Sequence, residues 1–162
     1  IILTEPEEHV SLLLFKLEAD IDCQKAKNMA ASFKKQYQDL IDISEGQKIA
    51  FGNISFTKNG INVSYDTRCK FDLYSPQFGV DIKTTAANSK KAFENSIDLF
   101  DYDRQAAFYM DTSCIDTFIF LGISNAAPHY IFRIVVNRND DRYNTGRAKY
   151  EELMYNKNIF YS

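Results

Sequence analysis

Residues 78–85 read FGVDIKTT, a short apolar run that contains a glycine near its start and ends in two threonines. The run predicts a short buried strand, although it carries Asp81 and Lys83 two positions apart. Alternation along a strand places these two charged side chains on one face, with Val80 and Ile82 on the other. Burying charges is costly unless they are paired or bind an ion, so the stretch indicates either a structural salt bridge or a functional site.

A second alternating stretch, RCKFDLY at residues 68–74, carries Asp72 near its end. The turn SPQFG at residues 75–79 connects it to the strand of Asp81, and a hairpin of this kind brings the two aspartates together. Two carboxylates at short range repel each other, and a hard divalent cation relieves the repulsion by binding to their oxygen atoms. The pair therefore predicts a metal site.

Residues 102–111, YDRQAAFYMD, show a helical pattern in which Gln105 and Tyr109 share one face. Ala106 and Ala107 are small enough for this helix to approach a sheet closely. The two polar side chains are then either a packed helix face or part of the rim of the site around Asp81.

The combination of these motifs resembles the PD-(D/E)xK nuclease superfamily, in particular its phage-type exonuclease VIII branch. It consists of an aspartate, the sequence Asp-x-Lys-Thr-Thr nine residues later, and Gln-x-x-x-Tyr on a following helix. The resemblance covers roughly residues 49–154, and its specificity lies in the combination, because Asp-x-Lys alone is common by chance.

The resemblance implies a restriction-endonuclease-like core and a metal-dependent deoxyribonuclease activity that acts on DNA in phage-type recombination or DNA processing. It implies Mg²⁺ or Mn²⁺ as the cofactor, and it allows a homo-oligomer and a single-strand annealing protein as partners. The implied catalytic residues are Asp72, Asp81, Lys83, Gln105 and Tyr109, and the implied metal ligands are Asp72, Asp81 and the Ile82 carbonyl oxygen.

The sequence departs from the superfamily pattern in two places. Relatives often have an arginine two residues before the first aspartate, where this chain has Lys70. Lysine keeps the charge but loses the bidentate geometry of arginine. The superfamily also draws a Glu or His from an upstream helix, and this residue either lies before Ile1 or is one of five candidates without a motif. These candidates are Glu5, Glu7, Glu8, His9 and Glu18.

Composition predicts one domain over residues 1–162, with enough apolar residues for a core. The start at Ile1 suggests a fragment that lacks an upstream helical segment. No apolar run is long enough to cross a membrane. The three scattered cysteines favour neither a zinc site nor a disulfide framework, and they therefore predict a reducing, cytoplasmic location. The net charge of −3 argues only weakly against nucleic acid, since a local basic groove is compatible with it.

Periodicity predicts an α+β fold with a mixed central sheet, an antiparallel meander and flanking helices. Asn59-Gly60 between alternating stretches predicts a hairpin turn. One more strand is expected between this turn and the turn at residues 75–79, and another strand after the second turn. Helices are expected at residues 4–15, 23–40, 86–100, 102–111 and 139–155, and further strands at residues 115–123 and 130–136.

Two functions other than a nuclease are compatible with the sequence. One is a catalytically weak or inactive nucleic-acid-binding or assembly domain with the same fold, which the unplaced upstream acid favours. The other is a metal-dependent hydrolase of a small phosphoester, which would lack a basic groove near Asp81.

Overall fold

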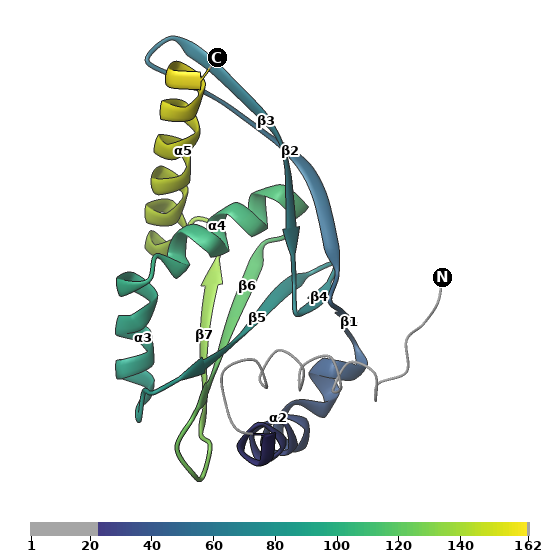
Figure 1. Ribbon diagram of the computed structural model, residues 1–162. Coiled ribbons are helices and arrows are strands. Elements are labelled where there is room, and N and C mark those ends of the chain that lie inside the picture. The colour runs from purple at the N-terminus through teal and green to yellow at the C-terminus, as the bar shows by residue number, and fades with distance from the viewer. Residues whose placement is uncertain (1–22, 162) are drawn as a thin grey trace.

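The computed structural model describes residues 23–161 (Figure 1). The helix expected at residues 4–15 and the five candidate upstream acids lie outside this range. In chain order the elements are α2 (Cys23–Asp42), β1 (Glu45–Gly46), β2 (Ile49–Lys58), β3 (Ile61–Lys70), β4 (Leu73–Ser75), β5 (Phe78–Thr85), α3 (Lys90–Leu99), α4 (Tyr102–Ser113), β6 (Thr117–Ser124), β7 (Ile131–Asn137) and α5 (Asp141–Tyr161).

The central sheet has five strands in the order β1-β4-β5-β6-β7. Strands β5 and β6 are parallel, and the other neighbours are antiparallel. The sheet lies between helix α2 on one side and helices α3 and α4 on the other (Figure 1). The expected α+β fold with a mixed central sheet and flanking helices is therefore confirmed.

The long hairpin of β2 and β3 differs from the expected meander because it forms a two-stranded sheet of its own. Its tight turn at Asn59-Gly60 is as expected, and Gly60 has a positive φ of 76° that suits glycine. After Lys70 the chain bends at Asp72, and the next strand, β4, joins the central sheet instead. Strand periodicity indicates which residues are extended, but it does not indicate which sheet they join.

The two faces of β5 pack against different helices. Val80 and Ile82 are buried with Met29 and Phe33 of α2. The other face of the sheet, around Phe120 of β6, is buried in a second core cluster to which α3, α4 and α5 contribute. This is the alternation that the sequence predicts for β5, and it leaves Asp81 and Lys83 on the side of α4.

Helix α4 lies close to both the sheet and α5. Ala106 and Ala107 are fully buried, which fits their expected role in allowing a close approach. Gly146 of α5 faces the backbone of Asp103, and a Cβ atom added at Gly146 would lie 2.0 Å from that carbonyl oxygen. The tip of the β2–β3 hairpin contacts α5 through Lys58, which forms an ion pair with Glu152.

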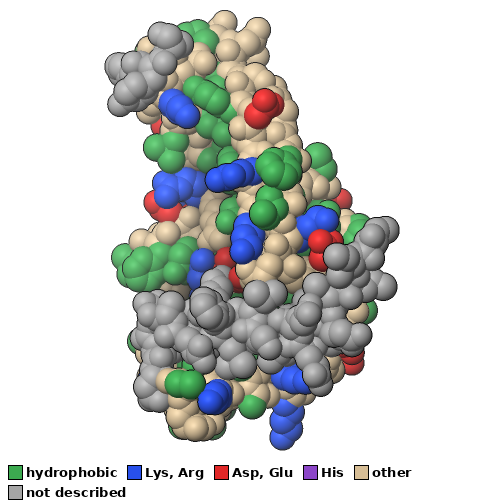
Figure 2. Space-filling view, turned by 45° about the vertical axis from the view of Figure 1, so that its right-hand side comes forward, with side chains coloured by type: hydrophobic (Ala, Val, Ile, Leu, Met, Phe, Trp, Pro, Cys, Tyr) green, Lys and Arg blue, Asp and Glu red, His purple; other side chains and the backbone are tan. Residues whose placement is uncertain are grey.

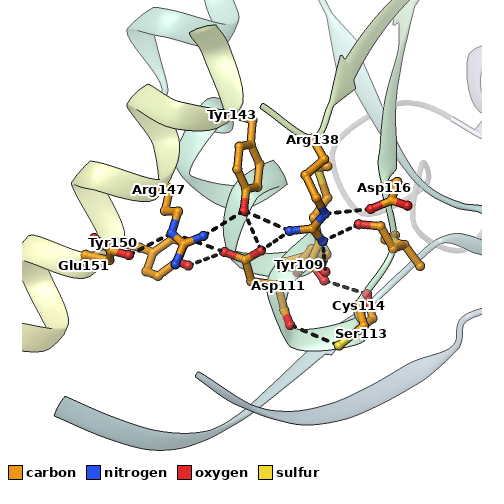
Figure 3. Close-up of polar contacts among 12 residues, drawn as sticks. Tyr109, Asp111, Ser113, Cys114, Asp116, Arg138, Tyr143, Arg147, Tyr150 and Glu151 are labelled. Atoms are coloured by element: carbon orange, nitrogen blue, oxygen red, sulfur yellow. Dashed lines mark hydrogen bonds and ion pairs between the residues drawn. The ribbon is translucent and has the colours of Figure 1, made fainter. Parts of the chain in front are cut away.

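A buried polar network fixes α5 to the end of α4 (Figure 3). Asp111 accepts hydrogen bonds from the hydroxyl groups of Tyr143, at 2.7 Å, and Tyr150. Arg138 of β7 donates to the same carboxylate at 2.7 Å and to the Ile115 carbonyl oxygen at 2.7 Å. Each buried polar group in the network has a partner, so we interpret it as structural.

Among residues 23–161, none of the helices is both long and apolar enough to span a membrane.

Candidate active site

Asp72 and Asp81 lie side by side where β4 meets β5. The backbone N–H of Asp72 donates to the Val80 carbonyl oxygen at 3.1 Å, and the Asp72 Oδ2 atom accepts from the backbone N–H of Ile82 at 2.7 Å. Asp72 is therefore bonded to both chain neighbours of Asp81. Both carboxylates are buried. The bend at Asp72 thus places two acidic groups together in a part of the protein that excludes most water.

Asp81 is contacted from its own strand and from helix α4. Lys83 Nζ lies 2.7 Å from Asp81 Oδ2, and Gln105 Nε2 donates to Asp81 Oδ1 at 3.0 Å. The structure therefore brings together the lysine of Asp-x-Lys and the glutamine of Gln-x-x-x-Tyr around one carboxylate. One oxygen of Asp81 thus accepts a hydrogen bond and the other forms an ion pair, and together these contacts orient the carboxylate.

Lys83 projects into a partly enclosed aromatic environment. Its Nζ atom lies 4.7 Å from the centre of the Tyr102 ring, within the range of a cation–π interaction. Lys83 pairs in register with Gly122 of β6, over which the Phe93 ring lies so closely that a Cβ atom at Gly122 would be 2.5 Å from it. The ammonium group is therefore held between the aspartate and an aromatic wall.

Tyr109 has its ring in the core and its hydroxyl group on the side of the site. The ring packs edge-on against Phe71 and Phe118, with centroids 5.3 and 5.7 Å away. Burial raises the pKa of the Tyr109 hydroxyl group, and the negative charge of Asp81 raises it further, while a hydrogen bond with Gln105 acts in the opposite direction. The hydroxyl group therefore stays protonated at neutral pH and remains a hydrogen-bond donor.

Two residues near the aspartates were not among the sequence-predicted site residues. Tyr102 precedes Gln105 by three positions on the same helix face, a spacing that could have predicted its proximity to Lys83. Gln47 donates from its side chain to Asp72 Oδ1 at 3.3 Å and from its backbone to the Asp72 carbonyl oxygen at 2.9 Å. It lies in a turn with a positive φ of 53°, and no periodic pattern indicates it.

The donor chemistry of the site suits a hard divalent cation. Asp72 and Asp81 offer carboxylate oxygens, and each ionised carboxylate has about four lone-pair positions, so one hydrogen bond to an oxygen leaves others for a metal. Mg²⁺ is usually bound through one or two carboxylates with several waters retained. Within residues 23–161, no group of three or more His, Cys, Asp and Glu side chains forms a metal-binding cluster.

A mixed sheet carries Asp-x-Lys on a central strand, and an aspartate from the adjoining bend is bonded to that strand. A helix bearing Gln-x-x-x-Tyr contacts the aspartate of Asp-x-Lys. This is a fold of the PD-(D/E)xK nuclease type, as the sequence resemblance implied.

The family assignment agrees. A family model described as a PDDEXK-like domain of unknown function (DUF3799) matches residues 15–157, and the chain belongs to this family. No curated protein matches the chain.

Two solved structures are similar to this chain. A candidate exonuclease from Eubacterium rectale has a TM-score of 0.62 and 18% identity, and the match covers 83% of this chain and 52% of that one. The chain thus spans about half the length of that protein, and the likeness concerns the fold. A phage-related exonuclease from Haemophilus somnus 129PT has a TM-score of 0.42 and 12% identity, with 93% and 82% of the two chains covered.

Proposed function

We propose that this chain is a Mg²⁺- or Mn²⁺-dependent deoxyribonuclease domain, and specifically an exonuclease of the kind that acts in phage-type recombination or DNA processing. The observation that carries the proposal is the convergence of Lys83 and Gln105 on Asp81, with Asp72 bonded to the residues on either side of it. A structural salt bridge needs neither the second buried aspartate nor the amide from another helix. The family and the fold of its structural neighbours support the same reading.

The metal would be held by Asp72, Asp81 and the Ile82 carbonyl oxygen. When bound there, a divalent cation would supply Lewis-acid polarisation of a phosphate oxygen and would lower the pKa of a water molecule. The role of the protein is to keep the two carboxylates adjacent in a buried setting, where the electrostatic interactions are stronger than in water. The bonds from Ile82 and Gln105 hold one oxygen of each carboxylate and so orient the other.

Lys83 is the residue that we assign to stabilising charge on the reacting phosphate. Its ammonium group already lies beside Asp81, and the Tyr102 ring restricts where else it can point. Such fixed positive charges are effective because little reorganisation is needed as negative charge develops. Gln105 acts through Asp81 as a positioning residue, and the protonated Tyr109 hydroxyl group supports Gln105 or the substrate strand.

A basic and aromatic surface on the outer face of the β2–β3 hairpin fits a nucleic-acid substrate. Arg68 lies opposite Phe51 in the ladder, and Lys70 lies opposite Ile49. All four side chains are exposed, with Phe51 at 75%, and within residues 23–161 no carboxylate forms an ion pair with Arg68 or Lys70. Figure 2 shows Lys and Arg side chains interspersed with hydrophobic ones on the side of the molecule that carries the hairpin.

This surface explains how a chain of net charge −3 can act on DNA. Strand β3 leads directly from Arg68 and Lys70 to the bend at Asp72, so these cations are close in the chain to the first aspartate. Cations attract the phosphate backbone locally while the acids elsewhere set the overall charge. A hydrolase of small phosphoesters has no need of such a surface, so the hairpin favours a polymeric substrate.

The test is digestion of linear and of covalently closed circular duplex DNA over a range of Mg²⁺ concentrations, with Asp81→Asn as the control. Metal-dependent loss of linear DNA with circular DNA intact supports an exonuclease. Cleavage of both substrates supports a nuclease but contradicts the exonuclease assignment. DNA binding without any cleavage that depends on Asp81 contradicts the proposal and supports the inactive binding or assembly domain.

A further inference from the structure

A cavity of about 440 Å³ lies between α4 and α5, next to the candidate active site. We refer to it as the aromatic trough and define it by Phe100, Tyr102, Gln105, Phe108, Tyr109 and Leu153, all of which line it. Its volume is in the range of pockets that hold small ligands, and aromatic and aliphatic side chains dominate its lining.

Two residues that line the trough also contact the candidate active site. Gln105 lines the trough and also donates to Asp81, and the Tyr102 ring lies below the Lys83 ammonium group. The Phe100 ring continues the same wall outward, with its centroid 5.7 Å from that of Tyr102. A phosphate bound beside Lys83 would therefore have aromatic rings within the reach of its own nucleoside.

The inner wall of the trough is rigid. Tyr150 lines it and donates its hydroxyl hydrogen bond to Asp111, which fixes the ring. The Phe108 ring packs edge-on against the Tyr150 ring at 5.9 Å. A preformed apolar surface binds a ligand without the cost of ordering side chains first.

The outer wall is apolar and open to solvent. Phe100 is 59% exposed and Leu153 is 54% exposed. The occupant that fits is flat, apolar on its faces and covalently linked to a phosphate, since Tyr102 and Gln105 of the trough also contact the Asp81–Lys83 pair. Nucleobases meet all three conditions, and stacking on aromatic side chains is a general means of binding them.

We propose that the aromatic trough binds an unpaired nucleobase of the DNA strand whose phosphate lies at the Asp81–Lys83 site. A base inside a duplex is stacked on both faces and cannot enter a side pocket without leaving the helix. The substrate presented to the site is therefore single-stranded DNA or a frayed duplex end. This inference rests on the proposed nuclease function, because it places a nucleotide at that site.

The experiment measures binding of a short single-stranded DNA oligonucleotide in Ca²⁺, with one abasic position moved along the strand. In the wild-type protein, one position should be sensitive, and loss of that base should lower affinity by about tenfold, the scale of one stacked base. Phe100→Ala and Leu153→Asn should each weaken binding of the intact strand and remove the sensitivity to the abasic position. Leu99→Ala is the matched control, since Leu99 is 75% exposed, adjacent to Phe100 and absent from the trough lining.

Three results would overturn the inference. One is equal affinity for every abasic oligonucleotide, and another is a sensitive position that persists unchanged in both trough variants. The third is a change in oligomeric state in the trough variants with base sensitivity retained, which would make the trough an interface between copies of the chain. Failure of the proposed function is distinguishable, because it appears as absence of Asp81-dependent cleavage, whereas this experiment reads binding alone.

Discussion

The Gln105 side-chain amide donates a hydrogen bond of 3.0 Å to Oδ1 of Asp81, joining helix α4 to strand β5 at the centre of the candidate site. On the other oxygen, Lys83 lies 2.7 Å away. The two partners come from different elements, Lys83 from the strand itself and Gln105 from a helix that follows it in the chain. Gln105 is therefore the site residue whose contribution to catalysis can be distinguished most clearly from its contribution to folding.

Gln105→Ala should impair DNA cleavage more than it impairs folding. The residue is partly exposed, so its loss removes little buried surface, but it frees one oxygen of Asp81 to turn away from its present orientation. The measurement is the specific activity of the folded fraction together with the midpoint of thermal unfolding. Gln38→Ala is the control, because Gln38 makes a similar amide–carboxylate contact with Asp42 on the surface at 2.7 Å. A Gln105 variant that only melts earlier, with normal specific activity, would show that the contact is structural.

Lys83→Ala should lower the rate of cleavage by about two orders of magnitude while leaving DNA affinity largely intact. Removal of one group that stabilises charge in the transition state typically has an effect of this size. Single-turnover cleavage and equilibrium binding separate the two contributions, with Lys90→Ala on the exposed start of α3 as the control. Parallel losses in rate and affinity would instead identify Lys83 as an anchor for the phosphate backbone.

Arg68→Ala should weaken DNA binding at low salt and reduce the salt dependence of the affinity by about one released counterion. The reason is that the exposed Arg68 guanidinium has no carboxylate ion-pair partner within residues 23–161 and is therefore available to a phosphate group. Arg133→Ala on β7 is the control, since Arg133 is also exposed but lies at the other edge of the molecule from the hairpin. Identical salt slopes for the Arg68 variant and the wild type would remove the hairpin from the DNA-binding surface.

Asp111→Ala should destabilise the fold by about 3 kcal/mol without removing the metal response, because it removes the acceptor of two tyrosine hydroxyl groups and the least exposed ion-pair partner of Arg138. Asp116→Ala provides the comparison. Both aspartates lie 2.7 Å from Arg138, but Asp111 is 11% exposed and Asp116 is 80% exposed. The exposed pair should therefore contribute less than about 1 kcal/mol. Urea unfolding of both variants measures the difference, and equal destabilisation would contradict the structural role assigned to the Asp111 network.

The sequence predicts most of this fold because the signals are local. Apolar alternation specifies β5 and the face on which Asp81 and Lys83 lie, and Asn59-Gly60 specifies the hairpin turn. The pairing of β2 and β3 as a separate sheet was missed, because it depends on the bend at Asp72 that redirects the chain into β4. Strand partners are set by contacts between distant segments, about which periodicity carries no information.

In the candidate site, too, the residues with a local sequence signal were predicted and those that depend on distant contacts were not. The motif identifies Asp72, Asp81, Lys83 and Gln105. The structure brings the side chains of Lys83 and Gln105 to Asp81, and it bonds the Asp72 carboxylate to the backbone N–H of Ile82, the next residue. Gln47 could not be found in advance, since its contact with Asp72 depends on a turn conformation that has no sequence repeat. The aromatic trough was equally hidden, because its walls come from two helices whose approach depends on Gly146.

The most direct test of the central claim, that Asp72 and Asp81 hold one divalent cation, is the shift in the midpoint of thermal unfolding on adding Mn²⁺ or Mg²⁺. A cation that binds only the folded state raises this midpoint in proportion to the logarithm of its concentration above the dissociation constant. We expect a rise in the wild type and in Lys83→Ala. We expect no rise in Asp72→Asn or Asp81→Asn, and a normal rise in the exposed control Asp39→Asn. A metal-dependent rise that persists in both aspartate variants would place the cation elsewhere and contradict the assignment of this site.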